Sequence, residues 1–376
     1  MTINEEITMA RYKVIQWATG YTGIFALRYI LLNPALELVG LKVFSADKAG
    51  KDAGELCGLP PVGVTATTSL EDILAMDADC VVYTPGFYDM QDPAVPGSNT
   101  HEIFQTLLAL LENGKNVATT VCPLIETTHY AGGARVREQI EAACKKGGTT
   151  FFGTGFEPGF MADVLPLTLA STCGVVDSFT ATECLDYSDY YTAALETLQA
   201  MGFGCKPESL GDLGPEPILL TWGSVPHMAA RGLGVKLDDI KVDVDIYLAP
   251  ETFHIGANAV EKGTIAAMLF RLTGIVGGQP KIVLQHVNRL RDDMAPDWPR
   301  VDPSGGYRIE IAGTNPVRAD FQLGLPGSEG NSFTDAMAMT AARCVNSVEA
   351  VVQGDIGFKT FYDLPPLTGK YTMHDA

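Results

Sequence analysis

The stretch WATGYTGIFA, residues 17–26, follows a short apolar run (residues 12–15) and leads into the helical pattern LRYILLNP. Its spacing matches the turn G-x-G-x-x-G if Ala18 takes the first position and Gly20 and Gly23 the others. In such a turn the first residue makes the bend, the second lets the backbone approach a pyrophosphate, and the third packs helix on strand. A helix N-terminus also favours an anion. Taken alone, the motif fits either a dinucleotide cradle or a structural turn.

Apolar runs alternate with helical patterns from residue 12 to about residue 160. The expected strands are 12–16, 37–44, 80–83, 116–120 and 149–153, and the expected helices are 24–32, 70–75, 102–112 and 134–146. This order predicts a parallel sheet with helices on both faces, which binds ligands at the carboxyl ends of its strands. Those ends read FSADK, TPG, TTVCP and GTGFEPGF. Because they are rich in small and hydroxyl residues, they favour the dinucleotide cradle.

A nicotinamide dinucleotide is therefore the expected cofactor. Its contacts are predicted at Thr19, Gly20, Tyr21, Thr22, Gly23, Ser45, Lys48, Thr84, Pro85, Gly86 and Thr119. NAD-binding folds place an acid at the tip of the second strand, about 20 residues past the glycines, to hold the ribose 2′-OH. Here the tip is Phe44-Ser45 with Lys48 close behind, which favours the 2′-phosphate of NADP. Asp47 leaves NAD as the alternative.

The pattern changes after residue 160, where glycine and proline punctuate the chain. The segments KVDVDIYLA, ETFHIG, KIVLQHVNRL and GYRIEIAGTNPVRADFQLG alternate with a period near two and predict a mixed or antiparallel sheet. SFTDAMAMTAARCVNSVEAVVQG predicts a helix that is capped by Ser332 or Thr334 and buried against the first domain. We expect an α/β protein with a Rossmann domain (1–160), an α+β substrate and dimerisation domain (161–330), and a returning helix and tail (331–376).

Composition excludes several classes of protein. The chain of 376 residues is 46% hydrophobic, which suits two domains with a substantial core. A net charge of −19 argues against nucleic acid and anionic membranes as partners. The absence of a long apolar run and of a signal-like N-terminus predicts a cytoplasmic protein. The 8 cysteines form no C-x-x-C pair and the 6 histidines are dispersed, so reduced thiols and no metal site are expected.

The segments QWATGYTG, FSADKAGKDAGELCG, ENGKNVATT, GTGFEPGFMADVLP, LDYSDY, MGFG and FYDLPPLTG span nearly the whole chain. They resemble the dihydrodipicolinate-reductase-like oxidoreductases, in the branch of 2,4-diaminopentanoate dehydrogenase and the native amine dehydrogenases. The resemblance implies a Rossmann domain, a C-terminal α+β domain and a homodimer. It also implies hydride transfer between NAD(P)H and a carbonyl, imine, alcohol or amine carbon of a small-to-medium organic substrate. The alternative is a cofactor-binding paralogue without redox turnover.

The resemblance places a catalytic glutamate after the expected strand 116–120 in amine-forming members. Here that segment reads TTVCPLIE, so its first acid is Glu126, and a second acid, Glu157, stands in the GTGFEP turn. Reduction of C=O or C=N needs a proton donor, and a buried carboxyl with a raised pKa can supply it. We expect Glu157 or Glu126 to be this acid, with His129 as a third candidate. The displaced acid predicts weak amination and favours carbonyl, alcohol or C=C chemistry.

Substrate contacts are predicted at Phe160, Tyr187, Tyr190, Met201 and Phe203. Closely spaced tyrosines in LDYSDYYT fit a pocket for a large or aromatic substrate, and they fit a half-buried surface helix equally well. For Met201 and Phe203, both pocket and core remain open.

Overall fold

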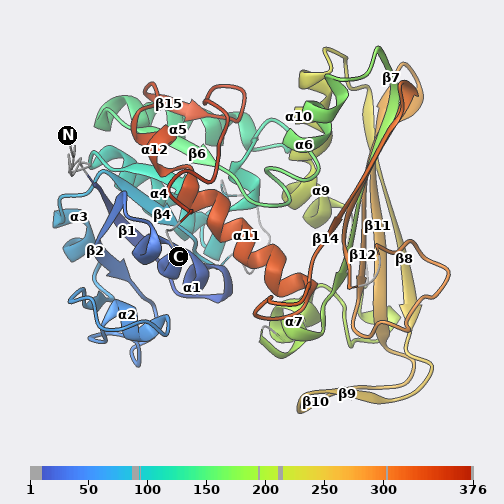
Figure 1. The fold of residues 1–376 in the computed structure, drawn as a ribbon, viewed down its shortest axis with the longest axis horizontal. Helices are drawn as coiled ribbons and strands as arrows, with labels where there is room; N and C mark the ends of the chain where they lie inside the picture. Colours follow the sequence, from blue (N-terminus) through green and yellow to red (C-terminus); the bar gives the residue numbers. More distant parts are fainter. Residues whose placement is uncertain are drawn as a thin grey trace, which may run out of the picture.

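The computed structural model describes residues 11–86, 93, 95–193, 195–210, 215–301 and 304–373. Two large sheets lie next to each other, with most helices on the first sheet or between the two (Figure 1). Within the described ranges, every helix is too short or too polar to cross a membrane.

The first sheet is parallel throughout and has seven strands in the order β15-β6-β5-β4-β1-β2-β3. The strands are β1 (Tyr12–Trp17), β2 (Leu36–Lys42), β3 (Ala66–Thr67), β4 (Cys80–Tyr83), β5 (Asn116–Thr119), β6 (Thr150–Gly153) and β15 (Gly357–Lys359). All five expected strands are present, which confirms the predicted Rossmann-like sheet. The second ends at Lys42, before the predicted Phe44.

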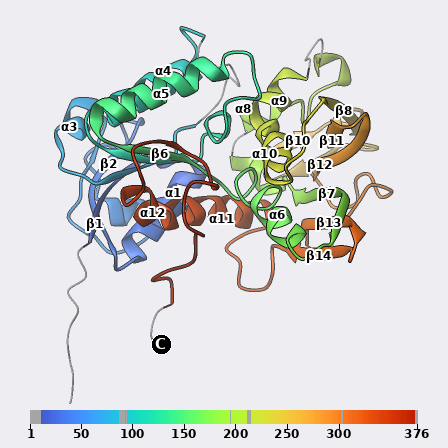
Figure 2. The ribbon, with the colours of Figure 1, turned by 90° about the horizontal axis from the view of Figure 1, so that it is seen from above.

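Helices cover both faces of this sheet, with α4 and α5 on one side and α1, α11 and α12 on the other (Figure 2). Neighbouring strand residues divide between two hydrophobic clusters: Val14 belongs to the cluster with α1, and Ile15 to the cluster with α4 and α5. The alternation follows from the two-residue period of a strand. The helices are α1 (Tyr21–Leu32), α2 (Ala53–Leu56), α3 (Leu70–Ala75), α4 (Asn99–Glu112), α5 (Gly133–Gly147), α11 (Ser332–Asn346) and α12 (Val348–Val352).

The second sheet is mixed, as predicted, and has six strands in the order β14-β13-β7-β12-β11-β8. The strands are β7 (Val175–Asp186), β8 (Asp239–Leu248), β11 (Ile265–Val276), β12 (Gln279–Arg289), β13 (Gly306–Thr314) and β14 (Val317–Gln322). Only the β7–β12 pair is parallel among these pairings. Strands β7 and β11 were not expected from the sequence. The first six residues of β11 are all buried, so it lacks the alternation that marks a half-exposed strand.

Shorter elements complete the described fold. They are the helices α6 (Val164–Ala170), α7 (Ser188–Ala193), α8 (Leu195–Ala200), α9 (Glu216–Trp222) and α10 (Ser224–Gly232), the 3₁₀ turns η1 (Cys122–Leu124) and η2 (Pro207–Leu210), and the hairpin β9 (Phe253–Ile255) and β10 (Asn258–Val260).

Helix α11 connects the two sheets. Phe333 and Ala336 near its start belong to the core of the second sheet, whereas Ala341 and Cys344 pack in the cluster with α1. The expected packing on the first domain is therefore found for its C-terminal half. The predicted caps are wrong: Asn331 is the N-cap, and its Oδ1 accepts from the backbone N–H groups of residues 333 and 334. Asn331, Ser332 and Thr334 all have side chains that can cap a helix, and the helix begins directly after Asn331.

Candidate active site

The turn between β1 and α1 has the geometry of a dinucleotide cradle. Ala18 has a φ of 75°, the left-handed conformation that favours glycine, so the first motif position keeps the bend without a glycine. A Cβ on Gly23 would lie 2.4 Å from the Ala18 carbonyl oxygen, so only glycine lets α1 pack this closely on β1. A Cβ on Gly20 would meet nothing within 4 Å. The space beside the N-terminus of α1 is thus open, and it fits a pyrophosphate.

A lysine reaches this turn from the segment after β2. Lys48 Nζ donates to the carbonyl oxygen of Thr19 at 3.0 Å and lies 3.2 Å from its Oγ1. Ser45 and Asp47 are both exposed in the same segment. The structure therefore brings a positive charge to the cradle and leaves Asp47 pointing to solvent.

Two other predicted cofactor residues donate hydrogen bonds from their hydroxyl groups to the protein backbone. Thr84 Oγ1 donates to the Trp17 carbonyl at 2.9 Å, and Thr119 Oγ1 donates to the Tyr83 carbonyl at 2.8 Å. Both threonines are buried, and these bonds tie together the ends of β1, β4 and β5. Pro85 and Gly86 follow β4 at the same edge. We conclude that Thr84 and Thr119 shape the edge beside the cradle.

Tyr21 and Thr22 face α11 instead of the open side of the turn. The Tyr21 hydroxyl lies 2.7 Å from Thr334 Oγ1, and Thr22 Oγ1 lies 3.6 Å from Met337 Sδ. These contacts bind the first turn of α1 to the helix that connects the two sheets.

Glu157 stands in a rigid turn after β6. Asp163 Oδ2 accepts from the Gly159 N–H at 2.9 Å, and Arg343 Nε donates to the Gly159 carbonyl at 3.1 Å. The Glu157 side chain is only 1% exposed, and its Oε2 lies 2.9 Å from His286 Nε2. The turn thus carries a carboxylate from the edge of the first sheet onto the face of the second.

His286 links Glu157 to a second buried carboxylate. Its Nδ1 lies 3.0 Å from Glu183 Oε1, and the Tyr307 hydroxyl donates to Glu183 Oε2 at 2.6 Å. The carboxylate oxygens lie out of line with the ring N–H bonds, so the two His286 contacts are ion pairs without good hydrogen-bond geometry. We call Glu157, His286 and Glu183 the ionic triad.

Burial and charge act in opposite directions on the pKa values of the triad. Burial by itself lowers the pKa of His286, but the two carboxylates together outweigh it and raise this pKa to about 10. Burial raises the pKa of Glu157, against the opposing charge of His286. We take an imidazolium between two carboxylates as the resting state, because each ring nitrogen lies within ion-pair distance of a carboxylate oxygen.

The same three side chains could in principle hold a metal ion. However, opposite ring nitrogens of His286 face the two carboxylates, and an imidazole that is protonated on both nitrogens cannot be a ligand. The imidazolium itself supplies the positive charge that a metal would bring.

Glu126 and His129 belong to a different group of residues. Glu126 is buried, accepts from the Thr128 N–H at 2.8 Å and lies 3.7 Å from Arg137. With His227 and Arg231 it lines a cavity of about 360 Å³ beside α10. Burial lowers the pKa of His129 to about 4, which favours the neutral ring near pH 7.

The predicted substrate residues belong to one hydrophobic core or pack against it. The Tyr187 ring packs at 5.1 Å from Phe333 and at 5.6 Å from Phe203, and Tyr190 stacks on Phe333 at 4.2 Å. The charges of Glu183 and Glu157 add to the effect of burial on the pKa of Tyr187, so this tyrosine lies beside the triad. Met201 packs at the edge of this core.

Phe160 packs against the same core, with the guanidinium of Arg343 at 4.5 Å from its ring. This arginine also braces the Glu157 turn. The role of Phe160 as a substrate contact stays a prediction.

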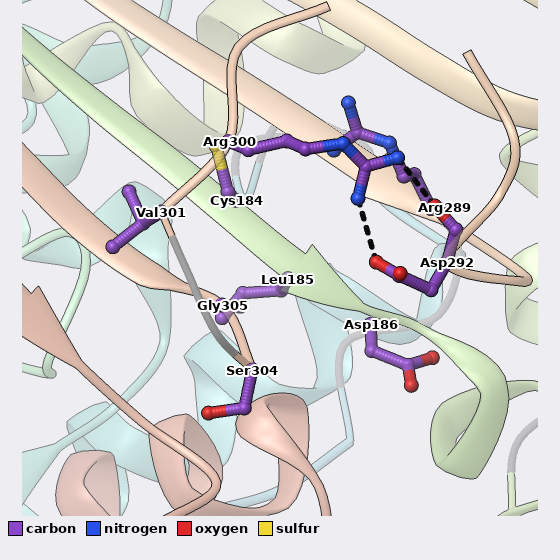
Figure 3. Close-up of a pocket in the computed structure, with 9 residues that line it drawn as sticks. All are labelled: Cys184, Leu185, Asp186, Arg289, Asp292, Arg300, Val301, Ser304 and Gly305. Carbon is purple, nitrogen blue, oxygen red and sulfur yellow. Dashed lines mark hydrogen bonds and ion pairs between the residues drawn. The ribbon is translucent and has the colours of Figure 1, made fainter. Parts of the chain in front are cut away.

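A small hollow lies at the carboxyl ends of β7 and β12, lined by residues that include Cys184, Arg289, Asp292 and Arg300 (Figure 3). Arg300 pairs with Asp292 at 2.6 Å, and Arg289 donates to backbone carbonyls of residues 294–299. Its volume, about 30 Å³, suits one water molecule. Cys184 neighbours Glu183 along β7, so the hollow and the triad lie on opposite faces of the sheet.

His286 and Glu183 were missed in the sequence because they lie on separate strands. A signal existed for His286. In KIVLQHVNRL it follows Ile282 and Leu284 at two-residue intervals, so a histidine occupies the buried face of the strand. A polar residue on a buried face requires a polar partner, but the pattern does not say which.

Comparison with known proteins agrees with this architecture. Residues 160–374 match the C-terminal domain of 2,4-diaminopentanoate dehydrogenase. An amine dehydrogenase of Streptomyces virginiae is 31% identical over 357 residues, which are 93% of this chain and 95% of that protein. The chain belongs to the 2,4-diaminopentanoate dehydrogenase family.

Membership confirms the predicted family branch and makes the protein an oxidoreductase that uses a nicotinamide dinucleotide. Another family member, the 2,4-diaminopentanoate dehydrogenase of Acetoanaerobium sticklandii, is 23% identical over 278 residues, 71% of each chain. The amine dehydrogenase structure from Mycobacterium smegmatis superposes with a TM-score of 0.78 at 16% identity, covering 96% of this chain and 98% of that one. That similarity confirms the fold.

Proposed function

We propose that this protein is an amine dehydrogenase, which interconverts a ketone plus ammonia with a primary amine. In this proposal Glu157 binds the nitrogen of the substrate. The observation that carries the proposal is the Glu157 carboxylate, whose side chain is 1% exposed and whose Oε1 has no hydrogen-bond partner among the described residues. A buried acceptor without a partner is costly unless a ligand satisfies it. An ammonium or iminium group would do so.

The displaced acid in the sequence favoured carbonyl, alcohol or C=C chemistry. The position of Glu157 in the structure supports amine chemistry instead. In the segment TTVCPLIE at the end of β5, the first acid, Glu126, comes several residues later than expected. Burial, together with the charge of Glu157, raises the pKa of the Cys122 thiol to about 12, so the two side chains lie within electrostatic reach. Glu157, from the turn after β6, therefore supplies a carboxylate near Cys122, whereas Glu126 pairs with the Thr128 N–H and Arg137.

The division of labour follows from the chemistry. The dinucleotide, when bound, supplies or accepts the hydride. Glu157 orients the nitrogen and exchanges a proton with it, and Tyr187 closes the space beside the triad. Burial of this group excludes water, which strengthens the interaction of the carboxylate with a cation.

The test is a panel of ketones with NADPH, with and without ammonia, followed by identification of the product. We expect cofactor oxidation to depend on ammonia and the product to be the amine. Equal oxidation without ammonia, with an alcohol as product, would show a carbonyl reductase and overturn the proposal.

NADP is the proposed cofactor, with Lys48 and Ser45 on the 2′-phosphate. The position of Lys48 Nζ beside Thr19 supports this choice. A hydrogen bond to a charged group contributes about 1.5–3 kcal/mol, which corresponds to roughly 10- to 150-fold in affinity. We expect Lys48→Ala to weaken NADPH binding by this factor and NADH binding much less, as measured by fluorescence titration.

Lys51→Ala is the matched control, because Lys51 is an exposed lysine in the same segment. It should leave both affinities unchanged. If Lys48→Ala weakens NADH as much as NADPH, Lys48 does not contact the 2′-phosphate.

A cytoplasmic homodimer completes the proposal. In Figure 1 the helices α6, α9 and α10 lie on the face of the second sheet toward the first, and the other face of its described strands looks outward. An outward sheet face is a suitable subunit interface. Light scattering of the purified protein should give twice the chain mass of 40.2 kDa; the mass of one chain would contradict the dimer.

A further inference from the structure

One row of side chains crosses four strands of the second sheet. Strand pairing sets Tyr307 opposite Glu183, Glu183 opposite His286, and His286 opposite Phe270. Paired residues point to the same face of a sheet. The row meets Glu157 on that face, so residues from the two sheets form one connected polar group with an aromatic end.

The aromatic end holds the imidazole in place. The Phe270 ring stacks on His286 at 4.5 Å with an interplanar angle of 18°, and Trp222 contacts it edge-on at 5.0 Å. These two aromatic contacts restrict the rotation of the ring, whose Nδ1 lies beside Glu183 and whose Nε2 lies beside Glu157. Its Nε2 then fixes Glu157 Oε2 and leaves Oε1 for another partner.

A buried ionic group of this kind is a poor device for stability alone. Replacing a buried ion pair by apolar side chains is often neutral or stabilising, whereas removal of one partner is strongly destabilising. Tyr307 adds a further hydrogen bond to Glu183 that the packing of the sheet does not require. The arrangement is therefore better explained by a charge that the site needs.

We propose that His286 is the positioning residue of Glu157, and that Glu183, braced by Tyr307, keeps His286 in its charged form. The inference rests on the proposed role of Glu157 in binding nitrogen. One imidazolium between two carboxylates leaves a net charge of −1 in a water-excluded site. An ammonium group neutralises this charge, whereas a neutral alcohol of the same shape does not.

The test compares two ligands of one shape, cyclohexylammonium and cyclohexanol, by calorimetry on the complex with NADP⁺. The parent should bind the cation more tightly than the alcohol. In His286→Gln one of the two buried carboxylates takes up a proton, so the net charge stays at −1, but Glu157 loses the ring that fixes its orientation. We expect His286→Gln to weaken binding of the cation by about 10- to 150-fold and to leave the alcohol unaffected.

The turnover of double variants provides a second measurement, which separates a positioning role of His286 from a merely structural one. If His286 acts through Glu157, its replacement should cost little in a chain that already carries Glu157→Gln. His254→Gln, at an exposed histidine of β9, is the matched control and should change neither readout. A cooperative melting transition and an unchanged NADPH affinity would show that each variant is folded.

Tyr307→Phe tests the same inference through a smaller change if His286→Gln does not fold. It should reduce the preference for the cation several-fold. An unchanged preference in the variants that fold, or penalties that multiply with Glu157→Gln, would overturn the inference. So would a stoichiometric metal ion in the parent that is lost with His286→Gln.

Failure of the two proposals can be told apart. A parent that aminates ketones but binds both ligands equally would overturn only the role of His286. A parent without ammonia-dependent turnover would overturn the proposed function, and the ligand comparison would then decide the role of His286 by itself.

Discussion

Replacing Glu157 with glutamine should lower turnover by about 10²–10⁴-fold, the usual contribution of general acid–base catalysis, while NADPH binds as in the parent. Glutamine keeps the size and much of the hydrogen bonding of glutamate, but it neither exchanges a proton nor attracts a cation. The buried Glu157 side chain contacts His286 of the second sheet, so we expect the cradle at Gly20 to keep its shape. Steady-state rates and a cofactor titration on one preparation measure both quantities.

Glu126→Gln is the matched control for this prediction and should be nearly silent. Glu126 is already paired with the Thr128 N–H and Arg137, and it lines the cavity beside α10. Ammonia-dependent turnover that survives Glu157→Gln but not Glu126→Gln would move the catalytic role to the loop after β5.

Gly20→Val should abolish binding of the dinucleotide and leave the free protein folded. A Cβ at this position meets no atom within 4 Å, and the φ of −72° is open to any residue. The branched side chain would then fill the space beside the N-terminus of α1 that the pyrophosphate needs. Titration with NADPH and the melting temperature of the free protein measure the two effects.

Gly23→Ala gives the contrasting result. Its Cβ would lie 2.4 Å from the Ala18 carbonyl oxygen and 2.9 Å from Thr84 Oγ1, so α1 must move away from β1. We expect a lower melting temperature even without cofactor. If Gly20→Val binds NADPH as the parent does, the turn at residues 18–23 is structural only.

Local patterns in the sequence were enough to predict the fold of the N-terminal half of the protein. The spacing of Ala18, Gly20 and Gly23, followed by four more strand-like runs that alternate with helical patterns, predicted a parallel sheet with a cradle at its edge. The structure contains all five strands. Such features are readable because a turn or a buried strand imposes its requirement on residues adjacent in the chain. Glu157 was also found this way, as the acid in the loop after a strand.

Only the tertiary structure decided what surrounds Glu157. His286 lies 129 positions after Glu157 and 103 after Glu183. The pairing of β7 with β12 sets Glu183 beside His286, and the turn after β6 brings Glu157 to the same ring. The residues between them leave no local pattern for this contact. The charge of the group has the same origin, because it depends on burial and on neighbours that different strands supply. The sequence therefore determined the position of Glu157, whereas the pairing of strands determined that His286 contacts it.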